Sequence, residues 1–396
     1  MKKKVFIRLF SLLLSIWTIC SSMSLYASDP ETPSTDEIPT ITQPQFQSDA
    51  KSLILIEATT GKVLYENNAD EALPPASVTK IMTLLLVMEA IDRGEIQLSD
   101  MVSVSENAAK MGGSQVYLEV GEQLSVEEMI KCVVIASAND AALALAELVA
   151  GTEEAFVAKM NERAQTLQMK NTHFENTNGL DDTSQNHVIS ARDIAIMSAE
   201  LMKHQTILKY TTIWQDSIRN GTFVLTNTNR LIRFYPGANG LKTGSTAKAG
   251  FCISAAAKKE GMQLIAVVMG ASTRDNRNEM AKQLLNWGFS NYTKITIENK
   301  ESLQLSVRYG KQQVVSVGYD SFDLVVEKNQ ASSIEKKINL NQTVNAPIRK
   351  GDAVGEIVCS IAQQEIAHYK IYATESVERT TFGSIFVQLI KNYFLI

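Results

Sequence analysis

Two residues three positions apart, Ser77 and Lys80, could together perform nucleophilic chemistry. An apolar run from Ile81 to Val87 follows them and predicts a helix, with Pro74 and Pro75 at its entry. Positions i and i+3 share one face of a helix, so the hydroxyl and the amine could touch. Ser77 would also lie at the positive end of that helix, where free backbone N–H groups can stabilise an anion.

A serine hydroxyl is a weak nucleophile without a base, and no histidine is placed to help, so Lys80 is the candidate proton acceptor. A lysine near its ordinary pKa of about 10.4 is protonated and cannot accept a proton. Burial and a second cation would lower that pKa. Lys242 supplies the cation if the fold brings the segment Lys242-Thr243-Gly244 beside the helix.

The short motifs carry little information alone. Ser-x-x-Lys also occurs at Ser48–Lys51 and Ser333–Lys336, and Ser-x-Asn also occurs at Ser105–Asn107 and Ser184–Asn186. Lys-Thr-Gly occurs once, at Lys242. Only the order, spacing and context of the motifs together can therefore point to a function.

That context is specific. Ser77 opens an apolar helix, Ser137-Ala138-Asn139-Asp140 breaks a strongly apolar helical region, and Lys242-Thr243-Gly244 is expected to begin a strand. With Gly112-Gly113-Ser114 and Asn178-Gly179-Leu180, the chain from about residue 49 onward resembles the penicillin-recognising serine enzymes. Within them it is most similar to the low-molecular-mass penicillin-binding proteins that act as D-alanyl-D-alanine carboxypeptidases.

The resemblance implies an enzyme that removes the terminal D-alanine from peptidoglycan stem peptides through an acyl-enzyme. β-Lactam antibiotics such as penicillin would inhibit it by acylating the serine. The catalytic residues implied are Ser77, Lys80, Ser137, Asn139 and Lys242. Ser137 would relay a proton to the leaving amine, and Asn139 would position Lys80 and the substrate amide. The family usually has glycine or aspartate where this chain has an alanine between these two residues.

Substrate binding is expected at Lys242, Thr243, Gly244, Ser245 and Arg277. The oxyanion hole would be formed by the backbone N–H groups of Ser77 and Ser245. Thr243 and Arg277 would receive the terminal carboxylate, Arg277 because it follows an apolar strand as in the family. The alternative for Arg277 is an ordinary surface charge on a helix.

Three other functions stay open. A β-lactamase of this fold would use an additional glutamate, and Glu175 stands at a suggestive distance after Asn139. Its surroundings, from Phe174 to Leu180, match the carboxypeptidase pattern instead. The other two are an endopeptidase that cuts wall cross-links and a wall-binding protein with an inactive site.

The fold class expected is α+β. Residues 48–290 read as a β-lactamase/transpeptidase-like peptidase domain, an antiparallel sheet with a helical cluster, in which the N- and C-terminal strands share the sheet. Residues 291–376 alternate apolar and polar side chains and predict a small all-β domain. Residues 377–396 carry aromatic and aliphatic side chains at helical spacing and predict an amphipathic helix at a membrane surface; packing on the protein's own core is the alternative.

The N-terminus predicts export to the outer face of the bacterial cytoplasmic membrane. Basic residues precede an apolar stretch, which reads as a signal peptide over residues 1–27, followed by a disordered lead-in over 28–47. An uncleaved membrane anchor is the alternative. Removing four basic residues from a chain of 38 basic and 43 acidic ones leaves a net charge of about −9, which argues against nucleic acid as a partner.

The sequence predicts no metal and no cofactor, since its four histidines lack metal-ligand spacing. Cys132, Cys252 and Cys359 lie in apolar runs and are expected to be buried thiols.

Overall fold

The central element is a five-stranded antiparallel sheet with the strand order β2-β1-β9-β8-β7. This computed structural model describes residue 44 and residues 46–181, 184–299 and 302–394. The strands are β1 (Ser52–Glu57), β2 (Val63–Asn67), β7 (Ala238–Thr246), β8 (Gly250–Lys259) and β9 (Met262–Ala271). The N-terminal and C-terminal strands therefore share one sheet, as the sequence predicts, because β1 pairs with β9 over its whole length.

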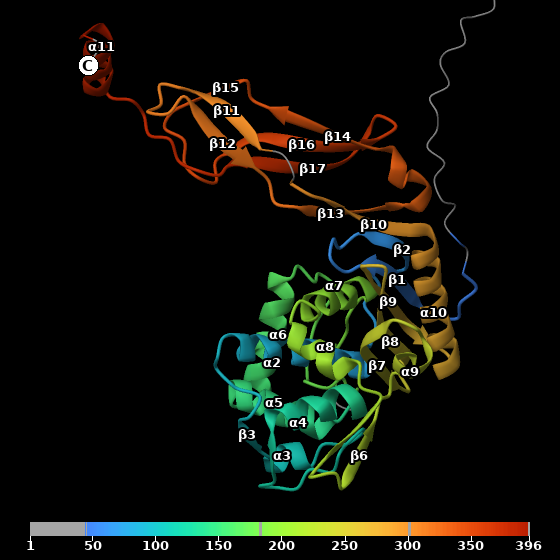
Figure 1. The fold of residues 1–396 in the computed structure, drawn as a ribbon. Helices are drawn as coiled ribbons and strands as arrows, with labels where there is room; N and C mark the ends of the chain where they lie inside the picture. Colours follow the sequence, from blue (N-terminus) through green and yellow to red (C-terminus); the bar gives the residue numbers. More distant parts are fainter. Residues whose placement is uncertain (1–43, 45, 182–183, 300–301, 395–396) are drawn as a thin grey trace, which may run out of the picture. The chain divides into compact units, whose positions relative to one another are not determined.

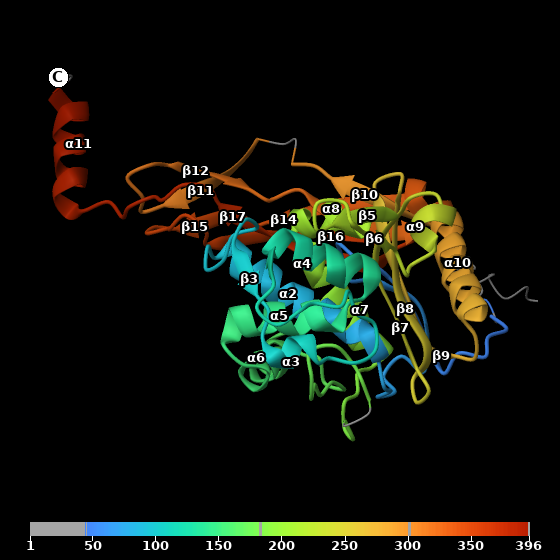
Figure 2. The same ribbon diagram turned by 90° about the horizontal axis from the view of Figure 1, so that it is seen from below.

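Alternation along the strands gives the sheet two apolar faces. In β1, Ile54 and Ile56 join one core, and Leu53 and Leu55 join the other. The first core contains the helical cluster, and the second contains α10 (Arg274–Asn291). Figures 1 and 2 both show α10 on one side of the sheet and the helical cluster on the other.

The helical cluster packs on the first of these two cores. Its members are the 3₁₀ helix η1 (Ala76–Thr79), α2 (Lys80–Asp92), α3 (Glu106–Ala109), α4 (Val126–Lys131), the π-helix η2 (Cys132–Ala136), α5 (Asn139–Ala150), α6 (Glu153–Thr166), α7 (Ala191–Leu201) and α8 (Gln205–Thr211). The short helix α9 (Leu231–Phe234) contributes Leu231 to the second core. A capping box begins α4, in which Ser125 and Glu128 accept hydrogen bonds from each other's backbone N–H groups.

Some short helices and strands are not predicted from the sequence, because a few residues are too few to show a hydrophobic period. These are α3, α8, α9, the two-stranded pair β3 (Met101–Ser103) with β4 (Gln123–Ser125), and β5 (Gln215–Ile218). The partner of β5, β6 (Phe223–Thr226), coincides with a short β-like run of the sequence. One boundary is wrong: the triplet Lys242-Thr243-Gly244 lies inside β7, which begins at Ala238, rather than at the start of a strand.

The segment after α10 is all-β, as expected, apart from the short 3₁₀ helix η3 (Lys328–Ser333). Strands β10 (Tyr292–Ile297) and β13 (Phe322–Glu327) form one antiparallel pair. The other sheet has the order β14-β16-β17-β12-β11-β15. Its strands are β11 (Leu303–Arg308), β12 (Val314–Gly318), β14 (Ile334–Leu340), β15 (Thr343–Asn345), β16 (Ala353–Ile361) and β17 (Gln364–Ala373). A separate apolar cluster, which includes Val315, Ile357 and Ile371, fills this region.

The last described element is the helix α11 (Phe382–Phe394), and it falls where the sequence predicts a helix. Within the described residues, no helix combines the length and apolar character needed to cross a bilayer. Cys132, Cys252 and Cys359 are buried free thiols, as predicted. The signal peptide and nearly all of the lead-in expected from the sequence lie outside the described residues.

Candidate active site

A polar cleft of about 170 Å³ lies where the site residues expected from sequence come together. It is lined by Ser77, Ser114, Ser137, Thr228, Thr243, Gly244, Ser245, Arg274 and Arg277. Lys80, Asn139 and Lys242 are buried and are hydrogen-bonded to residues that line the cleft or approach it. The catalytic and substrate-binding residues expected from the sequence therefore converge on one place.

Ser77 and Lys80 touch, as their spacing predicts. Ser77 lies in η1, and α2 begins at Lys80, so the pair spans the change from a 3₁₀ turn to an α-helix. Lys80 Nζ lies 2.9 Å from Ser77 Oγ, and it donates to Asn139 Oδ1 at 2.5 Å and to the carbonyl of Asn178 at 3.0 Å. The lysine side chain is completely buried, so its amine has these three partners in place of water.

The electrostatics of the site favour the neutral form of the Lys80 amine. Burial, followed by the charge of Lys242, lowers the pKa of Lys80 well below its usual 10.5, and the carboxylate of Asp140 opposes this only in part. Burial and then Arg277 lower the pKa of Lys242 to about 7. Two ammonium groups in one dry site repel each other, so the site disfavours a proton on both lysines at once.

Lys242 is linked to Ser137. Its Nζ donates to Ser137 Oγ at 2.8 Å and to the carbonyl of Thr243 at 2.9 Å. The polar break seen in the sequence creates this contact. Ser137 follows the end of η2 in the left-handed region, with φ 63°, and α5 begins at Asn139. The break turns the Ser137 hydroxyl into the cleft from a segment that is otherwise core.

Asn139 is oriented by the loop that carries Ser114. Its Nδ2 donates to the carbonyl of Gly112 at 2.7 Å, so its Oδ1 faces Lys80. Its backbone N–H donates to the carbonyl of Ser114, also at 2.7 Å. The Gly-Gly-Ser stretch noted in the sequence is therefore a backbone partner of the asparagine.

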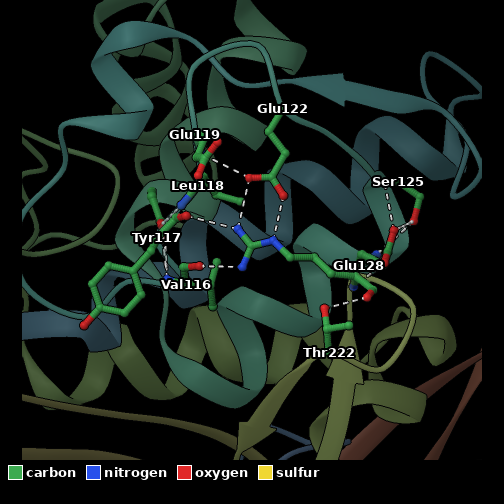
Figure 3. Close-up of polar contacts among 10 residues, drawn as sticks. Val116, Tyr117, Leu118, Glu119, Glu122, Ser125, Glu128 and Thr222 are labelled. Atoms are coloured by element: carbon green, nitrogen blue, oxygen red, sulfur yellow. Dashed lines mark hydrogen bonds and ion pairs between the residues drawn. The ribbon is translucent and has the colours of Figure 1, made fainter.

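That loop is itself held from two sides. Asp140 accepts the N–H groups of Val116 and Leu118, each at 3.1 Å. The guanidinium of Arg219, from the β5–β6 turn, donates to the carbonyls of Val116 and Tyr117 and to both carboxylate oxygens of Glu122. Figure 3 shows Val116, Tyr117 and Glu122 around this guanidinium. These hydrogen bonds fix the backbone of the loop that carries Ser114 beside the cleft.

Strand β7 packs directly against the nucleophile segment. A Cβ added at Gly244 would lie 2.7 Å from the backbone N of Ser77, a separation that real Cβ atoms do not show. Only glycine permits this approach. It places the N–H of Ser77 next to β7, which also carries Ser245 into the cleft.

Arg277 is buried rather than a surface charge, since only 3% of it is exposed. The alternative reading of this residue is therefore wrong. Its guanidinium donates to Asn278 Oδ1 and to the carbonyl of Cys252, which are both neutral oxygens. Burial in the first place lowers its pKa to about 10. A buried cation that lines a cleft without a carboxylate partner among the described residues is prepared for an anionic ligand.

Some members of the site were not anticipated. Arg274 and Thr228 line the cleft, and Thr228 Oγ1 accepts a hydrogen bond from Thr243 Oγ1 at 2.9 Å. Nothing in the local pattern of the sequence marks either residue. Glu175, the residue that raised the β-lactamase alternative, is not among the cleft-lining residues, and its carboxylate accepts the N–H of Asn186.

Comparison with known proteins identifies the family of this chain. The peptidase S11 family model, described as D-alanyl-D-alanine carboxypeptidase, matches residues 38–273. A second model, described as the C-terminal domain of penicillin-binding protein 5, matches residues 291–379. The D-alanyl-D-alanine carboxypeptidase DacF of Bacillus subtilis is 44% identical over 345 residues, which cover 85% of this chain and 88% of that protein.

Solved structures are also similar. Penicillin-binding protein 5 from Haemophilus influenzae matches with a TM-score of 0.78 and 31% identity, over 86% of this chain and all of that one. Penicillin-binding protein D2 from Listeria monocytogenes, in its ampicillin-bound form, matches with a TM-score of 0.57 and 30% identity, over 62% of this chain and all of that one. The chain therefore belongs to the peptidase S11 family, the D-alanyl-D-alanine carboxypeptidases.

Proposed function

We propose that this protein removes the terminal D-alanine from peptidoglycan stem peptides, with Ser77 as nucleophile and Lys80 as its base. One observation carries the proposal: the environment of the Lys80 amine. A neutral amine has two N–H groups and one lone pair. Asn139 Oδ1 and the carbonyl of Asn178 accept the two N–H groups, so the lone pair is left for the hydroxyl of Ser77, 2.9 Å away.

In the acylation step, Ser77 Oγ attacks the carbonyl carbon of the penultimate D-alanine while its proton passes to Lys80 Nζ. The carbonyl oxygen becomes an oxyanion, which the N–H groups of Ser77 and Ser245 stabilise. Collapse of the tetrahedral intermediate breaks the peptide bond and forms the Ser77 ester.

The leaving amine needs a proton. Ser137 Oγ lines the cleft and accepts a hydrogen bond from Lys242 Nζ, so Ser137 gives its proton to the departing D-alanine and is reprotonated by Lys242. A pKa near 7 suits Lys242 to this donation at neutral pH. Acylation leaves a proton on Lys80 and removes one from Lys242, so a proton moves from Lys80 to Lys242 through solvent before the next step. Water then attacks the ester and gives a proton to the neutral Lys80, which passes it to Ser77 Oγ as the ester bond breaks.

The terminal carboxylate is received by Thr243 and Arg277. Both line the cleft, and the buried guanidinium of Arg277 lacks an anionic partner among the described residues. A carboxylate is the defining feature of a carboxypeptidase substrate, and β-lactam antibiotics carry one too. We expect such antibiotics to acylate Ser77; the ampicillin-bound structure of the Listeria relative supports this.

The first test is Ser77→Ala. We expect the release of D-alanine from a D-Ala-D-Ala peptide to fall by about 10⁴-fold or more, because the nucleophile is lost. Covalent labelling by a fluorescent penicillin should disappear, while the melting temperature stays within a few degrees. A Ser77→Ala protein that is still labelled would show that the nucleophile is a different residue.

A cross-linked stem-peptide dimer, assayed beside the linear peptide, decides between carboxypeptidase and endopeptidase action. Rapid turnover of penicillin would instead favour a β-lactamase. The position of Glu175 outside the cleft lining argues against that result.

We propose further that the protein is exported by a signal peptide over residues 1–27 and acts outside the cytoplasmic membrane, where its substrate lies. We propose boundaries between a peptidase domain (48–290), an all-β domain (291–376) and a membrane-anchor segment (377–396). The end of α10 at Asn291 and the start of the second family match at residue 291 support the boundary near 290.

We also propose that α11 binds the membrane interface. Most of its described apolar side chains are exposed, and Phe382 and Tyr393 are each 86% exposed. The exposed set is Phe382, Ile385, Phe386, Val387, Leu389, Ile390 and Tyr393. A short helix of this kind gains binding energy by burying its apolar face among lipid head groups.

Removal of Phe382–Ile396 tests the anchor. We expect the truncated protein to stop floating with phospholipid vesicles in a density gradient, because the apolar face is gone. Its D-alanine release in solution should stay within about two-fold of the full chain, since the site lies on other elements. Vesicle binding that survives the truncation would contradict the proposal, and the double variant Phe386→Glu, Leu389→Glu provides a full-length control.

A further inference from the structure

His187 is a buried histidine next to the nucleophile segment. Only 5% of it is exposed, and its Nε2 lies 2.8 Å from Oγ1 of Thr79, the residue just before Lys80. It is not among the residues that line the cleft. No role in the reaction described above uses it.

The hydrogen bonds around this ring have a defined direction. The backbone N–H of Glu175 donates to His187 Nδ1 at 3.0 Å, so Nδ1 carries no proton. The proton of the neutral ring is then on Nε2, which donates to Thr79 Oγ1. Thr79 Oγ1 in turn donates to the carbonyl oxygen of Ala76 at 2.9 Å. A continuous chain thus runs from the backbone of Glu175 to the backbone of Ala76, and each bond polarises the next.

The Ala76 carbonyl, at the end of this chain of hydrogen bonds, belongs to the same peptide group as the N–H of Ser77. The C=O of Ala76 and the N–H of Ser77 are parts of one planar unit and point in opposite directions. Whatever holds the oxygen therefore also sets the direction of the N–H, which is the oxyanion donor proposed above. Because Ala76 has a φ of 49°, in the left-handed region that alanine seldom adopts, this orientation needs support from its surroundings.

The surroundings are tight on both sides of this peptide group. A Cβ added at Gly179 would lie 1.9 Å from the Ala76 oxygen and 2.7 Å from Thr79 Oγ1. On the other side, β7 approaches the Ser77 nitrogen at Gly244. The loop of His187 and Gly179 thus covers the oxygen side, and β7 covers the N–H side.

We propose that His187 is a positioning residue: through Thr79 it holds the Ala76 carbonyl and so aims the N–H of Ser77 at the oxyanion. The inference rests on the proposed function of Ser77. His187 is not itself a base, since both its nitrogens have partners and it does not line the cleft. Burial also lowers its pKa to about 4, against the smaller opposing effect of Glu175, so the ring is neutral at the pH where the enzyme works.

Two substitutions of His187 test separately the hydrogen bonds made by its two ring nitrogens. In His187→Gln the side-chain amide can reach the place of Nε2 and donate to Thr79. In His187→Asn the side-chain oxygen can take the place of Nδ1 and accept the N–H of Glu175, but the amide is too short to reach Thr79. Thr79→Val removes the hydroxyl at nearly constant volume, and Thr79→Ser keeps it.

The measurements are the rate of acylation by a fluorescent penicillin, its final stoichiometry, kcat and KM for a D-Ala-D-Ala peptide, and the melting temperature. We expect His187→Asn and Thr79→Val each to slow acylation by about 10- to 100-fold, less than outright loss of an oxyanion donor. KM should stay within about two-fold, and labelling should still reach one penicillin per protein. His187→Gln and Thr79→Ser should remain within about three-fold of the wild type.

The double variant Thr79→Val, His187→Asn gives the decisive result. If both residues act through one chain of hydrogen bonds, losing both should slow acylation no more than losing one. The acylation rate of the double variant should therefore match that of Thr79→Val. The proposal would be overturned if the fold-reductions of the two single variants multiplied in the double variant. It would also be overturned by a His187→Gln protein as slow as His187→Asn, or by incomplete labelling that follows a fall in melting temperature. Ser77→Ala is assayed in parallel: if it is still labelled, the proposed nucleophile is wrong, whereas an unlabelled Ser77→Ala beside a fast His187→Asn rejects the positioning role alone.

Discussion

Lys242→Met is expected to inactivate the enzyme and at the same time to stabilise it. Acylation at pH 7 should fall by about 10³-fold, because Ser137 loses its proton donor and Lys80 is no longer kept neutral by a neighbouring charge. Without Lys242 the pKa of Lys80 rises, so the acid limb of the pH–rate profile should move to higher pH.

The sign of the stability change follows from proton binding. The pKa of Lys242 is about 7 in the folded protein and 10.5 when unperturbed, so between these values the unfolded chain binds more protons and stability rises with pH. Below pH 7 the full cost of about 5 kcal/mol is present, and above pH 10.5 it is gone. Methionine removes this cost but loses two hydrogen bonds, so we expect a net gain of about 2 kcal/mol at pH 6.

Thermal unfolding at pH 6 and pH 10 measures this difference. The gain in melting temperature should shrink as the pH rises. Lys258→Met, at an exposed lysine on the neighbouring strand β8, is the matched control and should change neither rate nor stability appreciably. A Lys242→Met protein whose acid limb does not move would show that Lys242 does not influence the protonation of Lys80.

Arg277→Gln is expected to reduce kcat/KM for a D-Ala-D-Ala peptide by about 100-fold. The loss of one partner from a buried charge pair typically costs 2–5 kcal/mol, and the terminal carboxylate would be that partner. Stability should not fall, since the variant removes a buried cation that has only neutral hydrogen-bond partners in the described structure.

A substrate whose terminal carboxylate is converted to an amide shows how much of this loss depends on the carboxylate. The wild type should process this amide poorly, and Arg277→Gln should process it no worse. Arg274→Gln is the control, because Arg274 also lines the cleft but is exposed, and we expect a loss of less than about five-fold. An equal loss on both substrates would mean that Arg277 acts through the pKa of Lys242 instead of binding the carboxylate.

Local periodicity explains what could be predicted about the fold. The contact between Ser77 and Lys80 follows from one helical turn, and the Ser125–Glu128 capping box follows from its spacing. Short apolar runs bounded by turn signals mark β1, β8 and β9 as strands. Their membership of one sheet follows from the order of strands and helices along the chain. Several short elements, such as α8 and the β3–β4 pair, were missed because a few residues carry little periodicity.

The sequence by itself determined the family, the α+β fold class and the identity of the residues that meet in the cleft. Tertiary structure decided how those residues behave. Burial lowers the pKa of Lys80 and removes Arg277 from the surface, and the packing of distant segments brings Arg274 and Thr228 to the cleft. It also placed His187 behind the Ser77 peptide group. The physical reason is that pKa values and hydrogen-bond direction depend on desolvation and on neighbours distant in the chain, which no local pattern of residues encodes.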